Sequence, residues 1–286
     1  MAAARTADIV IYIGGLNKSA HQDAESNDRL EYGLPYGQDG VIEALAAANP
    51  KLVVVNISGN AVAMPWIDRV PAVVQDWYLG SEAGHSLADV LSGAVNPSGK
   101  LPFTFPVAME DGPIKTEAQY PGIPSGKVLA GLRIFNEDYS EGLYVGYRWY
   151  DAQQVKPLFP FGYGLSYTTF EYGEPKVSKT SIAASGKVTV SVPVTNTGSV
   201  AGAEVVQFYV SDPEASVDRP VKELKGFAKV RLEPGETQTV SVELDRSALS
   251  FFDAAKHEWV AEPGRFDVLV GSSSADIRGT VSFDLK

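Results

Sequence analysis

The chain has 286 residues, a formal net charge of −11 and no cysteine. The negative charge argues against nucleic acid and against anionic membrane surfaces as partners, since both repel an acidic protein. Without cysteine the chain can form no disulfide and can use no thiol in catalysis. The three histidines, His21, His85 and His257, are too widely spaced to suggest a histidine-rich metal site.

The length predicts about two domains. No apolar run approaches the ~20 residues that are needed to cross a bilayer, and residues 1–7 lack the apolar core of a signal peptide. We therefore expect neither a membrane span nor a signal peptide within this chain, and the compartment stays unknown.

The first half of the chain alternates predicted strands with predicted helices. Strands that alternate with helices pair in parallel through right-handed crossovers, so this pattern predicts an α/β sheet. Residues 2–7 resemble the end of a helix with no strand before it, which suggests a sheet that lacks its first elements. The expected strands are 8–13, 52–57 and 72–78; the expected helices are 36–48, with Val41, Ile42 and Leu45 on its inner side, and 81–92, with Leu87, Val90 and Leu91 inward.

The second half of the chain shows a different period. Residues 107–140 are rich in glycine and proline and predict a long surface excursion without regular elements. From about residue 171 the apolar residues alternate, and turn signals such as Glu233-Pro-Gly-Glu236 separate the runs. Short alternating strands indicate an all-β sandwich of the immunoglobulin-like type. The expected strands are 187–194, 205–210, 222–229, 237–244 and 265–270.

This organisation predicts three segments. Residues 1–106 form the α/β domain, residues 107–170 form a long loop and junction segment that belongs to it, and residues 171–286 form the β-sandwich. The sandwich pattern offers no exposed row of aromatic residues, so we expect it to stabilise the protein rather than to bind carbohydrate.

The loop after the first predicted strand concentrates charge between Gln22 and Arg29. Ligands of open α/β sheets bind at the carboxyl ends of the strands, where this loop lies. Judged by composition alone, a charged loop is more often solvated surface than a site.

The order of residues in this loop resembles a known family. Glu25-x-x-Asp28-Arg29, followed by Leu34-Pro35 and Gln38, resembles the acid/base loop of glycoside hydrolase family 3, the β-glucosidase and β-xylosidase type. The segment 194–207 resembles the fibronectin type III-like domain that closes many members. By this resemblance the chain is the carboxy-terminal part of such an enzyme. Further strings follow in the family's order, at 49–59, 64–66, 77–84, 96–106, 144–149 and 157–168.

The resemblance implies a retaining β-glycosidase, which needs two carboxyl groups about 5–5.5 Å apart. Glu25 matches the family's general acid/base, whereas the family's nucleophile is an aspartate on a (β/α)8 barrel. Such a barrel takes ~250 residues, and only seven residues precede the first expected strand. We therefore expect hydrolysis of terminal β-linked sugars, most of all β-glucosides, only when a barrel completes the site, and an inactive chain alone. No cofactor and no metal are implied.

Other residues of the loop have weaker claims. Asp23 is a rival for the acid/base role. Asp28 would approach a sugar from the same side as Glu25, so an ion pair with Arg29 that shapes the loop is the favoured interpretation. Asp28 and Arg29 also remain weak candidates for substrate binding. Ser26 stands where family loops often have glycine.

Two aromatic residues near strand ends, Trp66 and Trp77, could stack on sugar rings. Trp66 is kept as a weak substrate-binding candidate, although core packing is favoured for both. Gly14-Gly15 lacks the full spacing of a nucleotide-binding loop, so no nucleotide is expected.

Two classes of function stay open at this point. The first is a glycosidase part whose partners are a β-linked oligosaccharide or glycoside and a barrel domain, in the same or another chain. The second is a non-catalytic carbohydrate-binding or scaffolding module descended from such an enzyme. In both, the exposed edge of a truncated sheet predicts possible self-association. Family analogy places the full-length enzyme in the periplasm or outside the cell.

Overall fold

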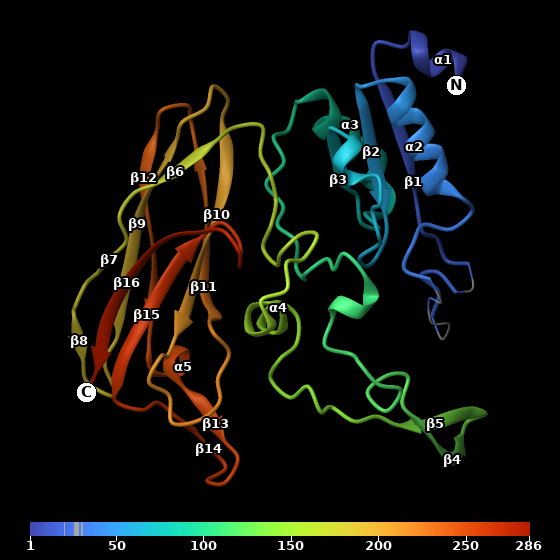
Figure 1. Ribbon diagram of the computed structural model, residues 1–286. Coiled ribbons are helices and arrows are strands. Elements are labelled where there is room, and N and C mark those ends of the chain that lie inside the picture. Colours follow the sequence, from blue (N-terminus) through green and yellow to red (C-terminus); the bar gives the residue numbers. More distant parts are fainter. Residues whose placement is uncertain (20, 26–28, 30) are drawn as a thin grey trace. The chain divides into compact units, whose positions relative to one another are not determined.

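The computed structural model describes residues 1–19, 21–25, 29 and 31–286 (Figure 1). Internal contacts divide the chain into two compact units, Met1–Val95 with Phe105–Asp111 and Asn96–Thr104 with Gly112–Lys286, called unit 1 and unit 2 below. The domain boundaries at 106 and 170 stay predictions, because these contacts divide the chain elsewhere. Within the described residues, no helix is both long and apolar enough to cross a membrane.

Unit 1 contains a parallel sheet, as the alternating pattern predicts. Its strands are β1 (Val10–Gly15), β2 (Leu52–Ile57) and β3 (Ala72–Gln75), in the order β1-β2-β3. All three are rich in β-branched residues, which suit a pleated and largely buried surface. β1 begins two residues later than expected and β3 ends three residues earlier, while β2 has the predicted bounds. The sheet brings the carboxyl ends of all three strands to one edge.

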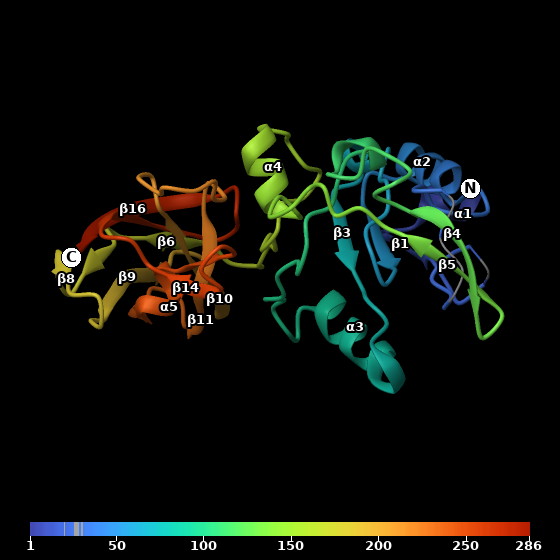
Figure 2. The ribbon, with the colours of Figure 1, turned by 90° about the horizontal axis from the view of Figure 1, so that it is seen from below.

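The helices of unit 1 are α1 (Ala2–Thr6), α2 (Gln38–Ala48) and α3 (Ala83–Ser92). Figure 2 shows the strands lying between α2 and α3. Ile42 of α2 is fully buried, but Val41 is 48% exposed, so the expectation that Val41 faces inward is wrong. Three 3-10 turns complete this unit: Ile67–Arg69, Gly80–Glu82 and Met109–Asp111.

α3 is less buried than its sequence pattern predicts. None of its residues is fully buried, and the predicted inner residues Leu87, Val90 and Leu91 are only half-buried. α1 and α2 are joined through Asn49, whose side-chain amide donates 2.8 Å hydrogen bonds to the carbonyl oxygens of Ala4 and Ala7.

β1 is an edge strand that pairs only with β2 among the described strands. Its odd-numbered side is apolar and open to solvent, with Ile9, Ile11 and Ile13 each about half exposed. Tyr12 points the other way and donates a 2.8 Å hydrogen bond to Gln38 of α2. Among the described strands, β1 thus has one unpaired side, and one of its two faces is apolar and partly exposed.

Unit 2 contains the predicted β-sandwich, built from a five-stranded and a four-stranded sheet. Its core consists of inward-facing side chains such as Val190, Phe208 and Phe266. The five predicted strands correspond to five observed ones, and the sequence pattern missed the shorter strands and β16. The larger sheet has the order β11-β10-β15-β16-β8: β11 (Glu223–Leu232), β10 (Gly202–Ser211), β15 (Gly264–Gly271), β16 (Ile277–Leu285) and β8 (Ser181–Ile182). The smaller has β12 (Thr237–Leu244), β9 (Val188–Asn196) and β6 (Phe170–Tyr172), with β7 (Lys176–Val177) on β9.

Besides the hairpin of residues 123–136 that is described below, further described elements of unit 2 lie outside these two sheets. They are the helices α4 (Tyr147–Gln153) and α5 (Arg246–Leu249) and the strands β13 (Phe251–Asp253) and β14 (Glu258–Val260), which pair as a hairpin. Two of the family-like sequence segments, 96–106 and 157–168, also bind each other. Leu101 exchanges backbone hydrogen bonds of 2.8 Å with Tyr163 and Gly162.

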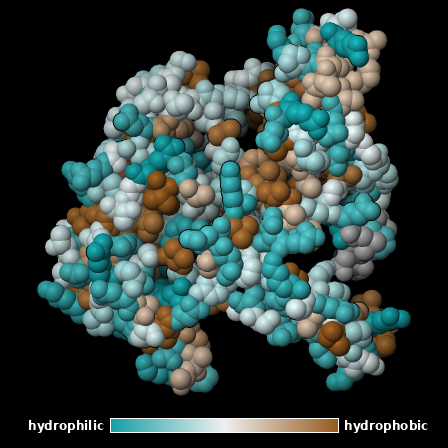
Figure 3. Space-filling view, in the orientation of Figure 1, coloured by the Kyte–Doolittle hydropathy of each residue, from teal (hydrophilic) through white to brown (hydrophobic). Residues whose placement is uncertain are grey.

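The segment 107–140 contains a hairpin, so the expectation of no regular element there is wrong. β4 (Ile123–Leu129) pairs with β5 (Leu132–Asn136). Ala130 and Gly131 between them both have positive φ, as two-residue hairpin turns of type I′ require. Alanine at the first of these positions hid the turn signal. Figure 3 shows apolar side chains at this hairpin, among which Val128, Leu129 and Leu132 are more than 60% exposed.

Gly15 at the end of β1 allows the strand to approach β2 closely. Its φ is +135°, and a Cβ atom there would lie 2.0 Å from the carbonyl oxygen of Ile57. We expect Gly15→Ala to destabilise the fold by more than about 2 kcal/mol, from backbone strain and overpacking. Chemical denaturation followed by circular dichroism measures this change.

Gly40→Ala is the matched control. Gly40 lies inside α2 with nothing within 4 Å of its added Cβ, so alanine should be neutral or stabilise the helix by up to about 1 kcal/mol. Similar stability of the two variants would contradict the close approach at Gly15.

Candidate active site

The charged loop leaves β1 and returns to α2, and Gln38 closes it at its base. The Gln38 side-chain oxygen accepts 2.8 Å hydrogen bonds from the Gly15 N–H and from the Tyr12 hydroxyl. Its amide nitrogen donates to the carbonyl oxygens of Gly15, at 2.8 Å, and Pro35, at 3.0 Å. One side chain thus binds both ends of the loop.

Gln22 supports the loop from inside. Its side chain is buried, accepts a 3.1 Å hydrogen bond from the Asn17 N–H and donates a 2.7 Å hydrogen bond to the Tyr36 hydroxyl. The backbone N–H of Asp23 also donates to the Asn17 carbonyl, at 3.1 Å. These bonds hold the loop backbone in place up to Asp23, two residues before Glu25.

Asp23 connects the loop to the ends of the two neighbouring strands. One carboxylate oxygen accepts from the Gly59 N–H, at 2.8 Å, and from the Tyr78 hydroxyl, at 2.7 Å. The other accepts from the Asn60 side-chain amide at 2.8 Å. Gly59 and Asn60 follow β2, and Tyr78 follows β3, so Asp23 links all three strand ends. Burial, and then the bond to Asp23, raise the pKa of Tyr78.

Arg29 provides a second connection to the same turn. Its guanidinium donates to the Asn60 side-chain oxygen at 2.7 Å and to the Ala61 carbonyl at 2.6 Å, and it lies 5.5 Å from the centre of the Tyr32 ring. Burial lowers the pKa of this guanidinium, an effect that the nearby carboxylate of Asp23 opposes.

Glu25 lies between these two anchored residues and is exposed. Asp28 lies outside the described residues, so its predicted ion pair with Arg29 stays a prediction. Among the described residues, Arg29 contacts Asn60, Ala61 and Tyr32. The loop therefore presents the exposed carboxylate of Glu25 beside a polar turn that Asp23 and Arg29 fasten.

Trp66 is fully buried, and its indole N–H donates a 2.8 Å hydrogen bond to Asp39 in the first turn of α2. Trp77 packs edge to face on Phe105, with ring centroids 6.3 Å apart. Both arrangements agree with core packing. In this structure the Trp66 ring has no surface for a sugar.

Sequence reasoning missed a polar network beneath this site. The buried Asn56 side chain donates to Gln75 at 2.7 Å and to Ser58 at 3.0 Å, and Gln75 donates back to Ser58. The hydroxyl of Ser58 then holds the carbonyl of Asn60 at 2.8 Å. In the sequence, this network corresponds to three polar residues, Asn56, Ser58 and Gln75, at the ends of the otherwise apolar strands β2 and β3. This network shapes the turn that Asp23 and Arg29 bind.

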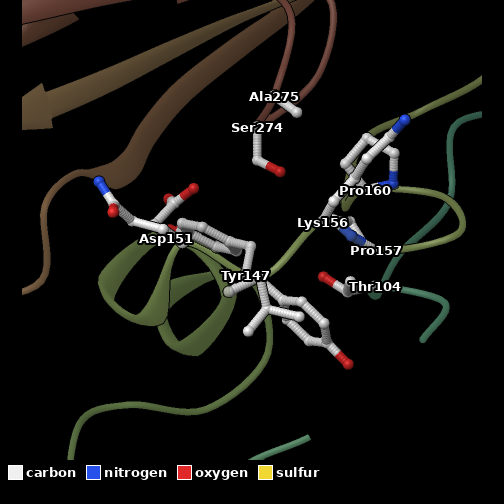
Figure 4. Close-up of a pocket in the computed structure, with 11 residues that line it drawn as sticks. Thr104, Tyr147, Asp151, Lys156, Pro157, Pro160, Ser274 and Ala275 are labelled. Carbon is white, nitrogen blue, oxygen red and sulfur yellow. The ribbon is translucent and has the colours of Figure 1, made fainter. Parts of the chain in front are cut away.

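A hollow with a volume of about 260 Å³ lies in unit 2, beside α4. Figure 4 shows Tyr147, Asp151 and Ser274 around it. Asp151 is its single carboxylate, and Lys222 binds that carboxylate at 2.5 Å. A two-carboxylate reaction cannot take place there. Within the described residues, no group of three or more histidine, aspartate or glutamate side chains could hold a metal ion.

The sequence motif 147–149 serves as an anchor within unit 2. The Tyr147 hydroxyl accepts from the Leu224 N–H at 2.9 Å, and Arg148 pairs with Glu223 at 3.1 Å. These contacts join α4 to β11, so the motif has a structural role within unit 2.

Removal of the Asp23 carboxylate should release the turn after β2. We expect the Gly59 amide to exchange its hydrogen roughly tenfold faster or more in Asp23→Ala, because a hydrogen bond to a charged acceptor contributes about 1.5–3 kcal/mol. Amide exchange followed by NMR measures this rate. Glu25→Gln is the control and should leave the rate unchanged; an equally unchanged rate in Asp23→Ala would refute the anchoring role.

Asp76, directly after β3, is buried, and burial raises the pKa of its carboxyl group. A pKa raised in the folded state favours the protonated form, so stability falls as the pH rises through that value. Asp76→Asn should therefore raise the unfolding temperature at pH 7, and this gain should disappear below about pH 4. Thermal unfolding at both pH values checks this, with the exposed Asp68→Asn as a control that should show no such gain.

Comparison with known proteins assigns both parts of the chain. Residues 1–167 match the glycosyl hydrolase family 3 C-terminal domain, and residues 204–274 match the fibronectin type III-like domain. The β-glucosidase BoGH3A of Bacteroides ovatus is 52% identical over 283 residues, which are 98% of this chain and 36% of that protein. β-Glucosidase B of Emericella nidulans is 46% identical and covers 99% of this chain and 33% of its own length.

Solved structures agree with these relatives. The β-glucosidase from Kluyveromyces marxianus in complex with glucose has a TM-score of 0.86 and 41% identity, over 100% of this chain and 32% of that one. DesR, a β-glucosidase from Streptomyces venezuelae in complex with D-glucose, has a TM-score of 0.89 and 39% identity, over 100% and 34%. The chain spans about a third of the length of the relatives that it matches. It belongs to glycoside hydrolase family 3, as a carboxy-terminal part made of an α/β domain and a fibronectin type III-like β-sandwich.

Proposed function

We propose that this chain supplies the general acid/base of a retaining β-glycosidase and that Glu25 is this residue. The observation that carries the proposal is the position of Glu25, which is exposed at the carboxyl ends of the parallel strands between two anchored neighbours. A carboxyl group in such a loop is open to a substrate, while Asp23 and Arg29 restrict where the loop can move.

Asp23 is less suited to this role than Glu25. Its two carboxylate oxygens already accept three hydrogen bonds, from Gly59, Asn60 and Tyr78. A general acid must approach the glycosidic oxygen and exchange a proton with it. Proton transfer at Asp23 would compete with the contacts that hold the loop to β2 and β3.

In the proposed reaction, Glu25 first donates a proton to the leaving glycosidic oxygen, while a second carboxylate attacks the anomeric carbon. Glu25, now ionised, then takes a proton from the water that hydrolyses the glycosyl intermediate. We infer that the nucleophile lies on a (β/α)8 barrel, in the same or another polypeptide. The chain alone should therefore not turn over glycosides.

The names of the relatives support terminal β-linked glucose as the substrate unit. Two of the matching structures are described as complexes with glucose. In this proposal the partner that completes the site binds β1, which pairs only with β2 among the described strands and beside which the Ile9, Ile11 and Ile13 side chains are exposed. Exposed strand edges recruit further strands, and this edge is also the proposed surface for self-association.

The role of Glu25 can be tested in a hybrid enzyme in which this chain replaces the matching third of the Bacteroides ovatus relative. Glu25→Gln should lower kcat about 10²–10⁴-fold on substrates with poor leaving groups. It should slow the glycosylation step of activated aryl β-glucosides less, because their leaving groups need little protonation. Azide should restore turnover of these aryl glycosides by attacking the intermediate without base assistance. Release of nitrophenol and of glucose measures both effects.

Glu31→Gln is the matched control, because Glu31 is an exposed glutamate of the same loop. It should retain nearly full activity on all substrates. Equal losses on all substrates in Glu25→Gln, without azide rescue, would contradict the acid/base role. Steady turnover by the 286-residue chain alone, abolished by Glu25→Gln, would contradict the need for a barrel.

A further inference from the structure

Trp259 differs from the other tryptophans of the chain in its exposure. Trp66 is fully buried and Trp77 and Trp149 are half-buried, whereas Trp259 on β14 is 65% exposed. A large aromatic side chain that stays in water forgoes the hydrophobic stabilisation that its burial would give. This exposure therefore calls for a reason outside the packing of the sandwich.

A second aromatic residue stands beside Trp259. The hairpin of β13 and β14 places Phe252 opposite Trp259 in register. Their ring centroids lie 5.7 Å apart with 68° between the planes, and Phe252 is 50% exposed. The sequence pattern offered no aromatic row in the sandwich because these two residues are seven positions apart. The hairpin brings them together as a rigid, exposed aromatic pair.

The Trp259 side chain borders a hollow with a volume of about 440 Å³, which lies within the range of ligand-binding cavities. Arg246, Ser247 and Ser250 line the rest of it. Ser250 is buried, and its hydroxyl donates to the Arg246 carbonyl at 2.7 Å, which holds the α5 turn in place. Arg246, Ser247 and Ser250 of the neighbouring helical turn bring polar atoms beside the aromatic ring, while most of the surface that lines the hollow is apolar.

Arg246 contributes unused hydrogen-bond donors to this hollow. It is exposed, and within the described part of the chain its guanidinium forms no hydrogen bond or ion pair. Ser247 is also exposed, and its hydroxyl donates to Asp245 at 2.5 Å, which leaves the oxygen free to accept from a ligand. The site therefore combines one aromatic face with both donors and an acceptor.

We propose that this hollow, lined by Trp259, Arg246, Ser247 and Ser250 and supported by Phe252, is a carbohydrate-binding site on the β-sandwich. A pyranose ring has an apolar face of C–H groups, which fits the Trp259 ring, and a rim of hydroxyl groups, which fits Arg246 and Ser247. The choice of a β-linked glucose oligomer as the ligand rests on the proposed function. The site would hold such a chain independently of Glu25, which lies in unit 1.

Titration of the 286-residue chain with cellopentaose tests this proposal, by isothermal calorimetry and by the fluorescence of Trp259. We expect saturable binding with a shift in tryptophan emission. Trp259→Ala should weaken binding at least about tenfold, because it removes the aromatic face on which the sugar ring would stack. Trp259→Phe should retain part of the affinity, and Arg246→Ala should weaken binding with the emission shift preserved.

Phe227→Ala is the matched control, because Phe227 is a 66% exposed aromatic residue on β11 that stacks on no other aromatic ring among the described residues. It should bind cellopentaose normally. Glu25→Gln should also bind normally, so a failure of the acid/base role would leave this result untouched. Absence of cellopentaose binding, or binding that survives in a folded Trp259→Ala variant, would overturn the proposal. A change in Trp259 emission that follows protein concentration instead of sugar would also overturn it, and would make this surface a contact between copies.

Discussion

The contact on which the candidate site depends is the acceptance of three hydrogen bonds by the Asp23 carboxylate. Its donors come from the turn after β2 and from the residues after β3, so a single side chain joins the ends of all three parallel strands. Parallel strands of a sheet are connected only through their ladders and crossovers, which leave the loops at their ends independent of one another. By bonding to the segments after β2 and β3, Asp23 ties these loops together at the edge of the sheet where ligands of such folds bind.

Arg29 binds the same turn from the other side of Glu25. The oppositely charged Asp23 and Arg29 are linked through a shared partner, Asn60. Asn60 donates through its amide nitrogen to Asp23 and accepts through its oxygen from Arg29. An asparagine suits this position because its side chain offers a donor and an acceptor together. The polar network of Asn56, Ser58 and Gln75 beneath the turn holds the backbone carbonyl of Asn60.

Much of the fold could be predicted from the sequence, because the elements with a clear period are also the buried ones. β2, β12 and the parallel pairing of the first three strands follow from apolar runs and turn residues. The β4–β5 hairpin could not be predicted, since its turn uses alanine in a left-handed conformation and its strands are exposed. The inward placement of Val41 was wrong because adjacent residues of an α-helix point about 100° apart, so Val41 does not share the buried face of Ile42.

The candidate site could be predicted in part, and the limit is again physical. Glu25 and the loop could be identified from local order, because the relevant residues are close in sequence. The partners of Asp23 and Arg29 lie some 30 to 55 residues further along the chain, and a single sequence carries no periodic signal for such contacts. The aromatic pair of Phe252 and Trp259 was missed for the same reason, since only the register of a short hairpin brings the two rings together.

The closure of the loop by Gln38 has a consequence for how this region can vary. Because one side chain binds Gly15 at the start of the loop and Pro35 at its end, the distance between the two ends is set independently of what lies between them. The entropy of closing a longer loop grows only slowly, by about 0.6 kcal/mol for each doubling of length. Insertions between residues 16 and 35 would therefore cost the sheet little, and a new loop could be exchanged here as a cassette on an unchanged scaffold.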